Sequence, residues 1–224
     1  MDMTNRVPEW LTPIAWTFIT LALLSAAAIA YDVYARRHRH GTVAAEIVWV
    51  TSALYLGPFA LPLYARHGRT AQISDTPRTA ATAQPVAVAG LPGGGASAVA
   101  HLIGVPVVIA SGLTIAGIDL WVMIIVIGLL AMALLFVYER TASGRGTSRA
   151  SSAGAAAMAA VLTVLAFDIG MGGWMLLLHF NEYMPPVDQG SFWFLMQVGI
   201  VLGLLTGYPA VTWLTRRHET VAPA

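Results

Sequence analysis

The sequence predicts an all-α protein, a polytopic transmembrane helical bundle of about six spans. The 224 residues are 57% hydrophobic and only 10% charged, whereas soluble domains usually carry about 25% charged residues. Several apolar runs also reach the roughly 20 residues that a helix needs to cross a bilayer. The chain therefore lacks the polar surface that would keep it in water.

The apolar runs give the approximate positions of the helices. The first run, from Trp10 to Tyr31, is longer than the apolar part of a signal peptide, so we expect it to be retained. The second, from 43 to 64, contains Pro58 and Pro62, which should bend its far end. The remaining spans are expected at about 98–116, 120–138, 155–180 and 192–214.

The number of spans depends on the apolar run 98–138, which is about twice as long as one span. A break at Gly117-Ile118-Asp119 gives six spans, and a single broken crossing gives five. Cytoplasmic loops of membrane proteins carry an excess of Arg and Lys. Six spans with both termini in the cytoplasm place nine of the twelve Arg inside, whereas five spans place eight inside. The Arg distribution therefore favours six spans.

Composition divides the chain into four parts: residues 1–65, an N-terminal transmembrane hairpin; 66–97, a linker; 98–215, a four-helix transmembrane part; and 216–224, a cytoplasmic tail. The linker is rich in Ala, Pro and Gly, includes Gly93-Gly94-Gly95 and lacks periodicity, so we expect it to be flexible. An Ala-rich chain whose basic residues are all Arg is typical of a bacterium with a GC-rich genome. We therefore expect the bacterial inner membrane as its location.

Residue types that are missing exclude several functions. The chain has no Lys, which excludes a retinal Schiff base, and no Cys, which excludes thiolate metal sites and covalent haem. No catalytic motif supports an enzyme, and no basic, aromatic-rich segment indicates nucleic-acid binding. The expected partners are the lipid bilayer and either a second copy of the chain or another membrane protein.

Asp168 lies near the middle of the predicted fifth helix, where a charge costs at least ~2.5–3.5 kcal/mol on insertion scales. At about 100° per residue, Asp168, Met175 and His179 fall on one stripe of this helix. This polar seam of carboxylate, thioether and imidazole favours transport or metal (copper) homeostasis. Alternatively, Asp168 fixes helix packing through a polar partner, for which the candidates are Gln197, Thr206, Ser111 and Thr114.

Ligand-type residues also gather where the fifth helix is expected to leave the membrane: His179, Glu182, Met184, Asp188 and Asp119. Copper or another divalent metal could bind to such side chains, although their spacing matches no strong motif. His101, at the start of the predicted third helix, should lie near the opposite face from His179. We therefore do not expect these two imidazoles to share a haem.

The predicted sixth helix has Gly199, Gly203 and Gly207 at every fourth position. Small residues at this spacing let two helix backbones approach closely. The face serves either packing within the bundle or association with a second chain. Association gives the alternative function, a non-catalytic membrane scaffold or assembly partner.

Several strings resemble a bacterial membrane family known as domain of unknown function 4396: FDIGMGGWM (167–175), FWFLMQ (192–197), TGYP (206–209) with Trp213-Leu214, and ALYLGP (53–58) with Tyr64 and Gly68-Arg69. Together they cover about half of the chain. Some members carry the loose label "copper oxidase", so the resemblance implies a copper role. The family's central region opens with a His-Cys and Gly-Cys pattern, but here HLIGVP (101–106) has no Cys, which weakens that implication.

Overall fold

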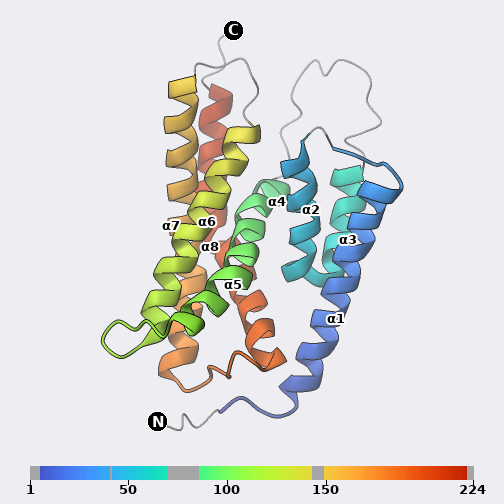
Figure 1. Cartoon of the computed structure of the whole chain (residues 1–224). Helices are drawn as coiled ribbons and strands as arrows, with labels where there is room; N and C mark the ends of the chain where they lie inside the picture. The colour runs from blue at the N-terminus through green and yellow to red at the C-terminus, as the bar shows by residue number, and fades with distance from the viewer. Residues whose placement is uncertain (1–5, 41, 70–85, 143–148, 221–224) are drawn as a thin grey trace.

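The structure, a computed structural model, describes residues 6–40, 42–69, 86–142 and 149–220. Every regular element within those ranges is a helix (Figure 1). Six segments are long and apolar enough to cross a membrane: Leu11–Ala35, Val43–Gly68, Leu91–Ser111, Asp119–Thr141, Ala156–Phe180 and Gly190–Leu214. The predicted all-α transmembrane bundle is confirmed.

The N-terminal segments contain short turns of non-α helix. Helix α1 (Leu11–Ala30) continues into a π-helical turn, η1 (Tyr31–Ala35). The second segment consists of α2 (Val43–Leu56), η2 (Gly57–Phe59), α3 (Ala60–Leu63) and η3 (Tyr64–Gly68). Beyond residue 85 the elements are α4 (Val86–Ala89), α5 (Leu91–Ser111), α6 (Asp119–Ala142), α7 (Arg149–Phe180) and α8 (Gly190–Thr220).

The segment Val43–Gly68 folds back on itself at Gly57, so it forms a helical hairpin (Figure 1). Gly57 has φ 59° and ψ −136°, a conformation that residues with a side chain rarely adopt. The ring centroids of Trp49 and Tyr64 lie 5.5 Å apart, whereas in one straight helix these residues would be about 22 Å apart along the axis. Both ends of the hairpin therefore lie beside the end of α1.

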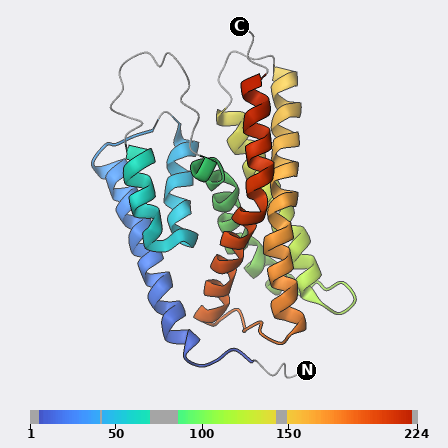
Figure 2. The ribbon, with the colours of Figure 1, turned by 180° about the vertical axis from the view of Figure 1, so that it is seen from behind.

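The described chain begins and finishes at opposite ends of the bundle (Figures 1 and 2). We call one end the Arg6 end. It contains the start of α1, the α5–α6 turn and the α7–α8 loop. There Arg6 Nε lies 3.1 Å from Glu182 Oε2. The other, here the arginine-rich end, holds every other described arginine: Arg36, Arg37, Arg39, Arg66, Arg69, Arg140, Arg149, Arg216 and Arg217.

Helices α5 and α6 are separate, so the alternative of one broken crossing over 98–138 is wrong. Helix α5 ends at Ser111, where Gly112 adopts the left-handed conformation (φ 63°) that commonly terminates helices. The backbones of Ile115 and Ile118 then exchange two hydrogen bonds of 3.0 Å within the connecting turn. The break thus begins five residues before the predicted position at Gly117.

The predicted linker 66–97 is partly helical, which corrects its boundary. Residues 70–85 lie outside the described residues, but α5 begins at Leu91 rather than at Ala98. A Cβ on Gly94 would lie 2.6 Å from the Tyr55 hydroxyl oxygen, and one on Gly95 would lie 2.5 Å from Thr51 Oγ1. The glycine run is therefore a packing surface for the hairpin.

Candidate functional site

The structure does not bring the residues of the predicted polar seam to one site. Met175 is buried in the core, and His179 lies at the Arg6 end with its ring 5.3 Å from that of Phe180. Asp168 and His179 are eleven residues apart on α7, about 16 Å along its axis. Among the described residues, the Asp168 carboxylate has no hydrogen-bond or ion-pair partner. One bound solute cannot contact both polar side chains.

The proposed partners of Asp168 make other contacts. Gln197 Nε2 donates to Leu54 O (2.7 Å), and Thr206 Oγ1 accepts from the Gly170 N–H (3.1 Å). Ser111 Oγ donates to Val108 O (2.7 Å) at the end of α5. Thr114 lies exposed in the α5–α6 turn. None of these hydrogen bonds involves Asp168, so its packing role through these four residues stays a prediction.

The residues of the predicted metal site also have other surroundings. Within the described part of the chain, no three His, Asp or Glu side chains are grouped so that they could hold a metal ion. Glu182 pairs with Arg6, Asp119 begins α6 and is exposed, and Asp188 is exposed in the α7–α8 loop. A site for copper or another divalent metal stays a prediction.

The glycine face of α8 is covered by α7 of the same chain. A Cβ on Gly203 would lie 2.6 Å from Phe167 Cζ, and one on Gly199 would meet Met171 and Trp174. Gly207 also faces Phe167, at 3.8 Å. In the structure this face therefore packs within the bundle, and association of a second chain through it stays a prediction.

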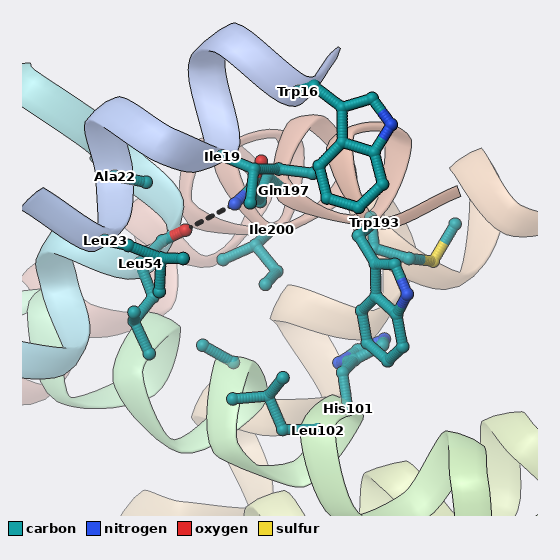
Figure 3. A pocket seen from close by; sticks show the side chains of 12 residues that line it. Trp16, Ile19, Ala22, Leu23, Leu54, His101, Leu102, Trp193, Gln197 and Ile200 are labelled. Carbon is teal, nitrogen blue, oxygen red and sulfur yellow. Dashed lines mark hydrogen bonds between the residues drawn. The ribbon is translucent and has the colours of Figure 1, made fainter. Parts of the chain in front are cut away.

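A cavity of about 260 Å³ lies at the tip of the hairpin, between α1, α5 and α8 (Figure 3). Its wall is mostly aliphatic and aromatic. The side chains that give it chemical character are Trp16, His101, Trp193, Met196 and Gln197. Under the predicted helix boundaries His101 belonged to a membrane face, but in the structure it is ten residues into α5, deep in the bundle.

His101, in the wall of this cavity, has a buried hydrogen-bond acceptor. The side chain is only 3% exposed, and its Nδ1 lies 2.8 Å from Ser97 O. A carbonyl oxygen only accepts, so Nδ1 carries the proton. Nε2 of the neutral ring is then a lone-pair acceptor, and it is buried without a partner among the described residues.

Gln197, on α8, has a second buried acceptor. Its Nε2 donates to Leu54 O, one of the last four carbonyls of α2, which have no partner inside that helix. The amide oxygen, Oε1, is buried and has no partner within the described ranges. In Figure 3 His101 and Gln197 approach the cavity from different sides. A buried polar atom without a partner costs about 1–3 kcal/mol.

Ion pairs hold the base of the hairpin to the segment after α1. Glu46, only 1% exposed, accepts from Arg39 Nε (2.7 Å) and from the His40 N–H (3.1 Å). Asp32 accepts from the Tyr64 hydroxyl (3.1 Å) and from Arg69 Nη2 (3.3 Å). Burial lowers the pKa of His40, although a Gly68 backbone hydrogen bond and Glu46 oppose this effect. These contacts fix the hairpin whose tip reaches the cavity.

One family model matches the chain, that of the "Domain of unknown function (DUF4396)", over residues 82–219. The match covers more than half of the chain and includes α5 and α8, which contribute His101 and Gln197. Comparisons with curated proteins and with solved structures gave no match.

Proposed function

We propose that this chain, which belongs to the family described as domain of unknown function (DUF4396), is a transport protein whose solute site is the cavity at the hairpin tip. One observation supports this function above all: His101 Nε2 and Gln197 Oε1 are buried in the wall of one cavity without donors from the described residues. Polar groups kept at a cost inside a transmembrane bundle commonly mark solute pathways.

The hairpin supports the same function. Backbone that turns within the membrane is tolerated where it is buried in protein or lines a cavity. In transporters, interrupted helices often form the solute site near the middle of the bilayer. Here the α2 end is buried, and Gln197 satisfies its Leu54 carbonyl beside the cavity.

We further propose that the arginine-rich end faces the cytoplasm of a bacterial inner membrane. Apart from Arg6, the described arginines lie at this end, as the excess of basic residues in cytoplasmic loops requires. The chain would then begin outside and finish inside, with the hairpin entering from the cytoplasm and the other five segments crossing. This orientation replaces the prediction that both termini are cytoplasmic.

Single cysteines test this orientation directly, because the chain has none of its own. In intact cells, a membrane-impermeant maleimide should label Glu9→Cys and Tyr183→Cys at the Arg6 end. Ala35→Cys, before the hairpin, and Ala65→Cys, in its last turn, should be labelled only after permeabilisation. If Ala65→Cys reacts from outside while Ala35→Cys is protected, segment 43–68 crosses the membrane and the proposed orientation is wrong.

Transport requires that water reach the cavity from at least one side of the membrane. We expect Ala98→Cys, in the cavity wall, to react with a small water-soluble methanethiosulfonate, because thiol modification needs the thiolate. Leu129→Cys, on the exposed outer face of α6, is the matched control and should stay unmodified in lipid. The proposal fails if folded Ala98→Cys resists the reagent from both sides of the membrane.

A further inference from the structure

We infer that the cavity at the hairpin tip takes an acyl chain of a phospholipid from the leaflet at the Arg6 end. This inference rests on the proposed function, since it names the class of solute that the proposed site takes. Three properties of the cavity support it, namely its depth in the bilayer, the surface that it presents and its opening.

The cavity lies between the hairpin tip and the Arg6 end of the bundle. The hairpin itself lies towards the arginine-rich end (Figures 1 and 2), so the walls beyond its tip come from α1, α5 and α8. Trp16 and Trp193 lie five and three residues after the first residues of α1 and α8, and Leu23 and Ile200 lie seven residues further along. Seven residues of helix span about 10 Å. The cavity therefore extends along the bundle from near the Arg6 end towards the hairpin tip, which is the direction of an acyl chain in that leaflet.

The surface inside the cavity is mostly hydrocarbon. His101 Nε2 and Gln197 Oε1 are buried in its wall, and the nitrogen atoms His101 Nδ1 and Gln197 Nε2 already donate to backbone carbonyls. No Arg, Asp or Glu is among the described residues that line the cavity. A charged group inside would therefore be desolvated without a countercharge. An acyl chain needs no polar partner, and it restores the dispersion contacts that an empty cavity lacks.

The cavity opens sideways towards the bilayer, between α1 and α5. Its rim includes Trp16, Leu23 and Leu102, whose exposed fractions are 53%, 57% and 52%. Exposed apolar side chains in the membrane-spanning parts of α1 and α5 lie against lipid tails, which are as apolar as leucine. The molecules beside the opening are thus the phospholipids of the bilayer, and their chains reach the cavity without passing through water.

The size of the cavity suits one chain and excludes a protein helix. An apolar protein cavity of about 150 Å³ is large enough to bind benzene, and this cavity has a volume of about 260 Å³. A helix of another membrane protein is about 10–12 Å across with its side chains, which is too wide for this space. The cavity therefore holds part of one acyl chain, while the headgroup stays at the membrane surface.

The test uses two phosphatidylcholines that carry a photoactivatable diazirine on one acyl chain. The diazirine lies next to the glycerol in one probe and near the methyl end of the chain in the other. The purified full-length protein would be irradiated in nanodiscs with each probe, and the adducts would be located by mass spectrometry of its peptides. We expect the first probe to label Trp16 and Trp193 and the second to label Leu54, which lines the cavity near the hairpin tip. An unlabelled Leu54, with exposed Leu129 on the outer face of α6 labelled, would overturn the inference.

Ala98→Leu places a larger side chain in the cavity wall, so it should abolish the labelling of Leu54 and leave that of Leu129 unchanged. The matched control is Ala110→Leu, the same substitution at an exposed position of the same helix. It should change neither labelling. A folded Ala98→Leu protein that still labels at Leu54 contradicts the inference, and if this variant does not fold, the labelling of the wild type decides alone.

The same experiment separates this inference from the proposed function. Because bilayer lipids exchange, a bound chain slows the reaction of Ala98→Cys with the methanethiosulfonate and does not prevent it. Labelled Leu54 together with an unreactive Ala98→Cys would leave the phospholipid site standing and remove transport. A reactive Ala98→Cys with an unlabelled Leu54 would leave transport standing and remove the phospholipid.

Discussion

Gly57→Val should remove most of the folded protein from the membrane. The backbone at this position (φ 59°, ψ −136°) is accessible to glycine and strained for valine. A Cβ would also lie 2.8 Å from Phe18 Cζ on α1. Together the strain and the clash should cost about 2–6 kcal/mol. The yield of monodisperse protein after detergent extraction, and its thermal midpoint, measure the loss.

Gly112→Ala is the matched control, because Gly112 also has a positive φ (63°) but nothing lies within 4 Å of its added Cβ. It should lose only the backbone preference, about 1–2 kcal/mol. Gly57→Ala should cost more than Gly112→Ala, both by the contact with Phe18 and because its backbone (ψ −136° against 13°) is less accessible to alanine. A Gly57→Val protein with the yield and thermal midpoint of the wild type would show that the chain does not turn back at this residue.

The sequence predicts the apolar segments well, yet it does not show which of them fold back. A hairpin and a crossing helix both place apolar side chains in the same lipid. The hydropathy of the sequence therefore does not distinguish them. The sequence around Gly57 and Pro58 predicts a kink in a helix. Only contacts across the turn, such as that of Trp49 with Tyr64, show that the chain reverses its direction there. Under the proposed orientation, the dense group Arg36, Arg37 and Arg39 is the stronger signal, because basic residues are in excess in cytoplasmic loops.

The glycine run 93–95 shows why the site itself was missed. A run of small residues is equally typical of a flexible linker and of a close helix contact. What distinguishes them here is the presence of Tyr55 and Thr51 on a helix about forty residues earlier, which no local pattern contains. Because the predicted linker ended at Ser97, His101 was predicted to lie near a membrane face. Its position in the cavity wall was therefore not predicted.

The polar residues illustrate the same limit. Asp168 and Gln197 are both recognisable from the sequence as polar groups in apolar helices. The partner of Gln197, the Leu54 carbonyl, is 143 residues away, and it exists only because α2 ends inside the bundle. The sequence thus predicts which polar residues lie in apolar helices. Which of them come together depends on a turn that leaves backbone carbonyls without hydrogen-bond donors.

Gly203→Leu should separate α7 from α8 and markedly lower the thermal midpoint of the protein. Three ring atoms of Phe167 would lie 2.6–2.8 Å from the added Cβ, and overpacking of this kind typically costs about 1–3 kcal/mol. Gly207→Ala on the same face is the control, because its Cβ would lie 3.8 Å from Phe167, an ordinary contact. It should leave the midpoint almost unchanged.

A double variant decides whether the glycine face serves this chain or a second one. Phe167→Ala alone should cost about 3–5 kcal/mol by leaving a cavity, but it also makes room for the new leucine. Gly203→Leu with Phe167→Ala should therefore lose less stability than the two single variants together, since residues in contact are not additive. Strict additivity, together with a change of oligomeric state in Gly203→Leu, would mean that another chain contacts this face. Coupling with an unchanged oligomeric state places the contact between α7 and α8 of one chain.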